Sequence, residues 1–191
     1  YLVLDGRPLF TSERTVADHP VKSPAVDVNA IGAGGGSIAW IDGGGALKVG
    51  PHSAGADPGP VSYGRGGEDV TLTDANIALG RLNPEALLGG RMSIDAEAAS
   101  KAIKDNIARP LGLSLEDAAI GIVRVAASGI ARAIRSVASA KGHNPTEFAL
   151  FSYGGAGPLL ASDVNDEVGC ARILVPCEPG TLCARGILLS D

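Results

Sequence analysis

Glycine is concentrated in segments of this chain where backbone amides could surround a bound group. These segments are residues 32–37, 53–60, 64–67 and 154–158. Glycine lets a ligand approach the backbone closely, and successive N–H groups in a tight loop can converge on an anion. Tight turns between short strands would account for the same residues. The spacing alone therefore predicts either an anion-binding backbone or a set of turns.

The last of these clusters has the clearest context. Glycines at 154, 155 and 157 lie between an apolar run at 148–151 and a predicted helix that begins near Pro158. Proline suits a first helical turn, where its missing N–H costs nothing, and the positive end of the helix dipole favours an anion or polar ligand. Neither a P-loop nor the dinucleotide G-x-G-x-x-G pattern is present. We expect a ligand above the strand end, with a plain turn as the alternative.

The elements that must position these loops are expected to divide near Ser93. Residues 1–92 predict a segment of short strands and glycine loops, and residues 93–191 predict an α/β segment. The elements expected in the first segment are a hairpin at Asp5-Gly6 that pairs residues 1–4 with 8–11, a strand at 26–31, a hairpin of 37–42 with 46–50, and a helix capped by Thr73.

Helical periodicity dominates the second segment. The elements expected there are a helix over 95–108, a long helix from a Ser114 cap to about Lys141 with Gly142 after its end, a strand at 148–151, a helix to Val168 closed by Gly169, a strand at 172–175, and a last helix over 184–191. A strand, helix and strand in this order predict a right-handed parallel unit.

Composition narrows the class of protein. The chain has 191 residues, including 27 Gly and 12 Pro, which suits one domain or one lobe of a larger protein. The net charge of −5 and the lack of a dense Lys/Arg run argue against a nucleic-acid partner, and no apolar stretch is long enough for a membrane span. Cys170, Cys177 and Cys183 match no zinc spacing, so we expect reduced thiols in a cytoplasmic protein.

The motifs, taken in order, resemble the hydantoinase A/5-oxoprolinase family. The motifs that carry the resemblance are I-G-A-G-G-G-S-I-A-W at 31–40, V-G-P-H-S-A-G-A-D-P-G-P at 49–60, Y-G-R-G-G at 63–67, T-D-A-N at 73–76 with L-G-R-L at 79–82, and G-G-A-G-P at 154–158. The resemblance implies an α/β fragment of an actin-like ATPase fold, related to sugar kinases and Hsp70, with a glycine-rich hairpin and loop insertion. It further implies that ATP drives the opening of cyclic amides such as hydantoins or 5-oxoproline.

The same resemblance implies site residues. The adenosine side of the nucleotide would lie on Gly154, Gly155, Ala156 and Gly157, and Gly34 and Gly35 would also bind the nucleotide. Asp57, Asp74 and Arg65 would serve catalysis, Asp27 would hold Mg²⁺, and His52 is a further candidate. A turn role for Asp57, a helix-cap role for Asp74 and a solvated loop position for His52 are the alternatives.

The family pattern also sets expectations about the whole protein. The chain is expected to be an internal fragment, inactive alone because the phosphate loops lie upstream, and to work with a hydantoinase B-like partner. The alternative is a nucleotide-binding subunit of an ATP-dependent ketone carboxylase. Leu160 stands where the family has His, and Ala127-Ser128-Gly129 where it has Asn residues, which predicts altered specificity or activity.

Overall fold

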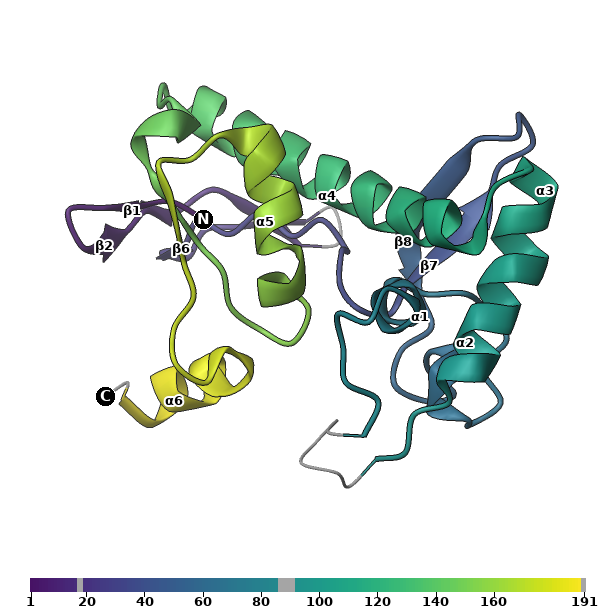
Figure 1. The fold of residues 1–191 in the computed structure, drawn as a ribbon. Helices are drawn as coiled ribbons and strands as arrows, with labels where there is room; N and C mark the ends of the chain where they lie inside the picture. The colour runs from purple at the N-terminus through teal and green to yellow at the C-terminus, as the bar shows by residue number, and fades with distance from the viewer. Residues whose placement is uncertain (17–18, 86–91, 190–191) are drawn as a thin grey trace.

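One long helix organises the molecule. In this computed structural model, which describes residues 1–16, 19–85 and 92–189, α4 spans 26 residues, Leu115–Ala140. The elements that pack along its N-terminal half are α1 (Leu72–Ala78), α2 (Ala96–Ile103) and the hairpin of β7 (Ser37–Ile41) with β8 (Leu47–Ser53), while α5 (Gly157–Val168) packs against its C-terminal half (Figure 1). The predicted α/β class is confirmed.

The sequence explains where α4 begins and ends. Ser114 is the N-cap, and its Oγ accepts from the Asp117 N–H at 3.0 Å, as the spacing predicts. Gly142, just beyond the end, has φ +75°, a conformation that glycine adopts without strain. The buried face carries mostly alanine, which lets neighbours approach closely: Ala118, Ala119, Ile122, Val123, Ala126, Ala127, Ala131 and Ala138.

The described strands form two-stranded sheets. The antiparallel pairs are β1 (Val3–Leu4) with β2 (Arg7–Pro8), β3 (Phe10–Thr11) with β6 (Ala25–Val26), β4 (Arg14–Val16) with β5 (His19–Val21), and β7 (Ser37–Ile41) with β8 (Leu47–Ser53). The remaining elements before α4 are η1 (Val61–Tyr63), α1 (Leu72–Ala78), α2 (Ala96–Ile103), the π-helical η3 (Lys104–Ala108) and α3 (Arg109–Leu111).

Three predictions for the first segment need correction. The Asp5-Gly6 hairpin forms, but Phe10–Thr11 leaves it to pair with β6. The strand predicted at 26–31 stops at Val26; Val28 is 53% exposed, so its alternation has no sheet to bury against. The cap of α1 is Thr71, whose Oγ1 accepts from the Asp74 N–H, and not Thr73, which is already inside the helix.

The predicted parallel unit is confirmed. Strand β9 (Ala149–Phe151) pairs in parallel with β10 (Arg172–Leu174), and α5 (Gly157–Val168) connects them. Gly169 ends α5 with φ +77°. The short helices η4 (Pro145–Glu147) and η5 (Pro179–Thr181) flank this unit, and α6 (Leu182–Leu189) follows; the last two residues of the predicted final helix lie outside the described part.

The core draws residues from both sides of position 93. Leu72 and Ala75 of α1 pack in one cluster with Ile103, Ile122 and Leu160. The division of the chain near Ser93 stays a prediction. In the described part, the three cysteines are free and no helix has the length and apolar character that crossing a bilayer requires.

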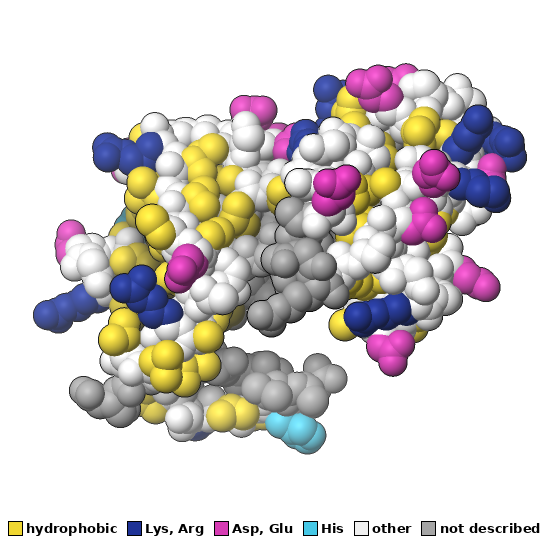
Figure 2. Space-filling model, turned by 60° about the horizontal axis from the view of Figure 1, so that its bottom comes forward, with side chains coloured by type: hydrophobic (Ala, Val, Ile, Leu, Met, Phe, Trp, Pro, Cys, Tyr) yellow, Lys and Arg dark blue, Asp and Glu magenta, His cyan; other side chains and the backbone are white. Residues whose placement is uncertain are grey.

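Charge and apolar surface are divided between the two ends of α4. Figure 2 shows charged side chains spread over the end with α2 and α3, and apolar side chains gathered over the end with α5 and α6. The apolar residues exposed at the latter end include Phe151, Leu174, Val175, Leu188 and Leu189.

Candidate functional site

The turn after β9 holds an unusual backbone geometry. Gly154 has φ +88°, and its N–H donates to the Pro179 carbonyl at 2.8 Å. The Ser152 N–H donates to the Leu174 carbonyl at 2.9 Å, so both ends of the turn are anchored to the segment that follows α5. Within the turn, Gly154 has positive φ and Gly155 does not.

Beyond Gly154 the turn presents unpaired amides. Among the described residues, the N–H groups of Gly155, Ala156 and Gly157 find no acceptor. They lie at the start of α5, a 12-residue helix, where the helix dipole favours negative charge. A Cβ built on Gly155 would meet no atom within 4 Å, so the backbone at Gly155 borders open space.

The side chain of Tyr153, just before Gly154, shares a hydrogen bond with the side chain of Tyr1. Together with partial burial, that bond raises the pKa of the Tyr153 phenol to about 12. The phenol therefore stays protonated and neutral at physiological pH.

The first glycine loop is closed by Ser37. Its Oγ accepts from the Gly34 N–H at 3.0 Å and donates to the Gly32 carbonyl at 3.4 Å, while its own N–H donates to the Gly34 carbonyl at 3.0 Å. Ser37 is 3% exposed. This network fixes the loop without a ligand, and the N–H groups of Gly35 and Gly36 have no acceptor in the described part of the chain.

The two glycine segments meet in space. The Gly35 carbonyl accepts from both the N–H and the Oγ1 of Thr73, each at 2.9 Å, which ties the loop to the start of α1. A Cβ on Gly35 would lie 2.7 Å from Thr73 Oγ1 and 3.7 Å from the Ala156 Cβ. The residues expected to bind nucleotide, Gly34 and Gly35 on one side and Gly154 to Gly157 on the other, therefore lie side by side. Their role in binding stays a prediction.

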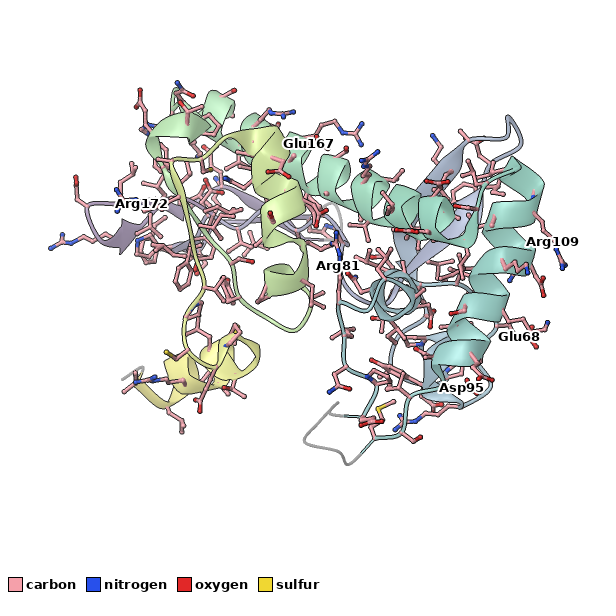
Figure 3. The ribbon with its side chains drawn as sticks, in the orientation of Figure 1. Glu68, Arg81, Asp95, Arg109, Glu167 and Arg172 are labelled. Carbon is pink, nitrogen blue, oxygen red and sulfur yellow. The ribbon has the colours of Figure 1, made fainter. Side chains whose placement is uncertain are left out.

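An ion pair holds these two segments together, and the sequence alone did not single it out. Arg81, just after α1, donates to the two carboxylate oxygens of Asp163 on α5 at 2.6 and 3.1 Å, and to the Leu159 carbonyl at 3.5 Å. The hydrogen bond to Asp163 raises the pKa of Arg81. Figure 3 shows Arg81 pointing from the α1 side towards α5. The L-G-R-L motif was the available signal.

Breaking this pair should loosen the contact between α1 and α5. A double-mutant cycle of Arg81→Gln and Asp163→Asn in thermal or urea unfolding should give a coupling of about 0.5–1 kcal/mol, since the pair is bidentate but about one third exposed. The same cycle on Arg109 and Asp105, which pair within one stretch of helix, should give less. Additive effects of Arg81→Gln and Asp163→Asn would show that the two side chains do not stabilise each other.

Asp74 lies at the structural centre of the first segment. It is fully buried, and its carboxylate accepts from the N–H groups of Val61, Ser62 and Thr71 and from the Thr71 hydroxyl, at 2.8–3.3 Å. It completes a capping box with Thr71 and fastens the 60–63 loop to α1. These contacts account for its burial without a substrate, and its catalytic role stays a prediction.

The other predicted charged residues lie apart from the glycine contact. Arg65 donates to the Ala56 carbonyl at 3.3 Å, which places it beside exposed Asp57 in the 54–67 loop; His52 is exposed on β8. Asp27 forms an ion pair with Lys141 at 2.6 Å. Across the described residues no three groups of metal-ligating type cluster. The roles of Asp57, Arg65 and Asp27 stay predictions.

The positions that differ from the family pattern serve packing. Leu160 is 2% exposed and belongs to the core, and Ala127 is buried in the same cluster. The Ser128 hydroxyl donates to the Glu167 carboxylate, and Arg135 donates to the Glu167 carbonyl, so this face of α4 fastens α5. Both contacts therefore hold α5 against α4.

Sequence comparisons relate this chain to known proteins. The chain is 44% identical over 186 residues to caprolactamase subunit alpha of Pseudomonas jessenii, a match that covers 97% of the chain and 27% of that subunit. It is 38% identical over 198 residues to 5-oxoprolinase of Saccharomyces cerevisiae, covering 98% of the chain and 15% of that enzyme. The chain thus spans less than a third of either relative.

A solved structure shares the fold. A nucleotide-free structure of acetone carboxylase, from work on ATP-dependent acetone carboxylation, superposes with a TM-score of 0.89 at 37% identity, covering 97% of this chain and 26% of that one. The family model for hydantoinase/oxoprolinase proteins matches residues 1–191. With every residue inside that match, this chain belongs to the hydantoinase/oxoprolinase family.

Proposed function

We propose that the protein containing this chain uses ATP to open cyclic amides, and that the turn 154–157 with the facing loop 32–37 forms part of its nucleotide site. The observation that carries the proposal is that a Cβ added to Gly35 would lie 3.7 Å from the Ala156 Cβ, so two segments with unpaired amides lie close together. The ATP-dependent activity of similar proteins supports it.

The residues present fit a nucleotide. Three amides at the N-terminus of α5 offer donors to a negative or polar group, and Gly155 leaves the space in front of them open. Loop 32–37 would close the other side, with Ser37 and Thr73 holding its shape. Donors fixed in this way need no rearrangement when charge develops on a bound group.

ATP would supply the activation that an unstrained lactam lacks. When bound, it gives its γ-phosphoryl group to the amide oxygen, the bond from phosphorus to ADP breaking as the new P–O bond forms; lactam, ATP and two waters then become the ring-opened amino acid, ADP and phosphate. This chain's part is to hold the nucleotide against the substrate with the reacting oxygens in line. Mg²⁺ at Asp27 stays a proposal, and in this structure the Asp27 carboxylate pairs with Lys141.

A second function has its own support. The acetone carboxylase likeness favours a nucleotide-binding subunit in a ketone carboxylase complex as an equal candidate. Caprolactamase subunit alpha and the beta subunit of acetone carboxylase are each one part of a protein with several subunits. We therefore also propose a partner subunit of the hydantoinase B type for this protein.

One assay separates the two functions. The full-length protein with its partner should hydrolyse ATP faster when 5-oxoproline, hydantoin or caprolactam is added, and should release the ring-opened amino acid. Stimulation by acetone or acetophenone with bicarbonate, and none by any lactam, would contradict the hydrolase and favour the carboxylase.

A further inference from the structure

A hollow lies against the first glycine loop, on α4. This open hollow has a volume of about 410 Å³ and lies between the loop at Ile31 to Ala33, the β7–β8 hairpin and the α4 face at Val125 to Arg132. That volume suits a small ligand. A second hollow of about 530 Å³ shares Ile31 to Ala33, Ser37 and Pro51 with the first and continues towards Gly34 and Ser53. The two therefore adjoin along one loop.

The walls combine apolar surface with cations. Trp40, Val49, Leu72, Val125 and Ala126 supply apolar surface, and the Trp40 indole is fixed because its Nε1–H donates to the Gly50 carbonyl at 3.0 Å. A mostly apolar lining with a few polar groups is typical of small-molecule sites. A lactam is a ring of methylene groups closed by one amide, so its apolar and polar parts match those of this lining.

The charged side chains of this lining are all cationic. Lys48 and Arg132 line the hollow, and its lining has no acidic residue, although the whole chain carries a net charge of −5. Lys48 already pairs with Asp42 at 3.4 Å. Arg132 has no carboxylate partner among the described residues, so its guanidinium can form two parallel hydrogen bonds with a carboxylate.

The hollow and the nucleotide turn share the loop between them. Gly32, Ala33 and Ser37 line the hollow, while a Cβ added to Gly35 would lie 3.7 Å from the Ala156 Cβ of the turn. A molecule in the hollow would therefore be separated by this one loop from a nucleotide on the turn, and the transfer of a phosphoryl group requires that the two be close.

We propose that this hollow binds the substrate and that Arg132 binds a carboxylate on it, so that the enzyme prefers cyclic amides with an acidic group to neutral lactams. The inference rests on the proposed function, and it adds the substrate class and the residue that selects it. The matched probes are 5-oxoproline and 2-pyrrolidinone, which have the same ring with and without a carboxylate.

The test uses the full-length protein with its partner and measures ATP hydrolysis against lactam concentration. In the unmodified protein, 5-oxoproline should half-saturate at a lower concentration than 2-pyrrolidinone. Arg132→Gln should raise the half-saturating concentration of 5-oxoproline by about tenfold or more, because a hydrogen bond to a charged group is lost. The values for 2-pyrrolidinone and for ATP should not change. Arg124→Gln, two turns earlier on α4 and outside the lining, is the matched control and should change none of them.

Other outcomes would overturn the inference. One is equal half-saturating concentrations of the two probes in the unmodified protein, and another is an equal effect of Arg132→Gln on both probes. A third is the same effect from Arg124→Gln. A fourth is an Arg132→Gln protein in which only the half-saturating concentration of ATP rises, which would place nucleotide phosphates in the hollow. Calorimetric titration of 5-oxoproline without ATP separates this inference from the proposed function. Binding that weakens in Arg132→Gln would support the hollow even if no lactam stimulates ATP hydrolysis, and unchanged or absent binding would overturn it.

Discussion

Gly155→Val in the full-length protein is expected to lose most of its ATP affinity, by about 100-fold or more, while its melting temperature stays within a few degrees of the unmodified protein. Gly155 does not have positive φ, and a Cβ added there meets no protein atom within 4 Å. The valine would therefore fit the fold but occupy the space in front of the amides of Ala156 and Gly157. Calorimetric ATP titration and thermal melts measure the two effects.

Two glycines nearby act as controls. Gly169→Ala at the end of α5, where φ is +77°, should cost about 1 kcal/mol of stability and leave ATP affinity unchanged. Gly154→Ala, at φ +88°, should reduce both, since it strains the turn itself. Unchanged ATP affinity in a well-folded Gly155→Val protein would mean that the turn is purely structural.

Asp74→Ala is expected to lower the free energy of unfolding by about 3 kcal/mol or more, since it leaves buried N–H and O–H donors without an acceptor. Asp74→Asn should also destabilise the protein, because its amide nitrogen would face these donors. Asp117→Ala is the control: it removes an exposed carboxylate from the first turn of α4 and should cost under about 1 kcal/mol. Thermal melts and urea unfolding measure all three.

The outcome for Asp74 decides between two roles. A large loss of stability assigns it to holding η1 against α1. An Asp74→Ala protein that melts like the unmodified one, yet hydrolyses no ATP with substrate present, would contradict this and assign the carboxylate to catalysis.

Local signals predicted the elements whose partners lie close in sequence. Ser114 with Asp117, Gly142 and Gly169 mark helix ends through backbone conformation and capping, which depend on few neighbours. The alternation at 26–31 failed because a strand also needs a partner, and β3 pairs only as far as Val26. The prediction of Thr73 as the cap was wrong because a second hydroxyl, that of Thr71, lies two residues earlier and accepts the hydrogen bond from the Asp74 N–H.

The sequence predicted less of the candidate site than of the helices and strands. Family motifs pointed to both glycine segments, but the contact between Gly35 and Ala156 depends on how α1 and α5 pack. The Arg81 pair with Asp163 and the position of Arg132 on the hollow depend on the same packing. Such contacts join residues far apart in the chain, and no local pattern encodes them.

The most direct test of the nucleotide site is a crystal structure of the full-length protein with its partner and a non-hydrolysable ATP analogue. We expect the analogue within hydrogen-bond distance of the amides of Gly155 to Gly157, with loop 32–37 on its other side. An analogue bound elsewhere, with these amides facing only water, would contradict it.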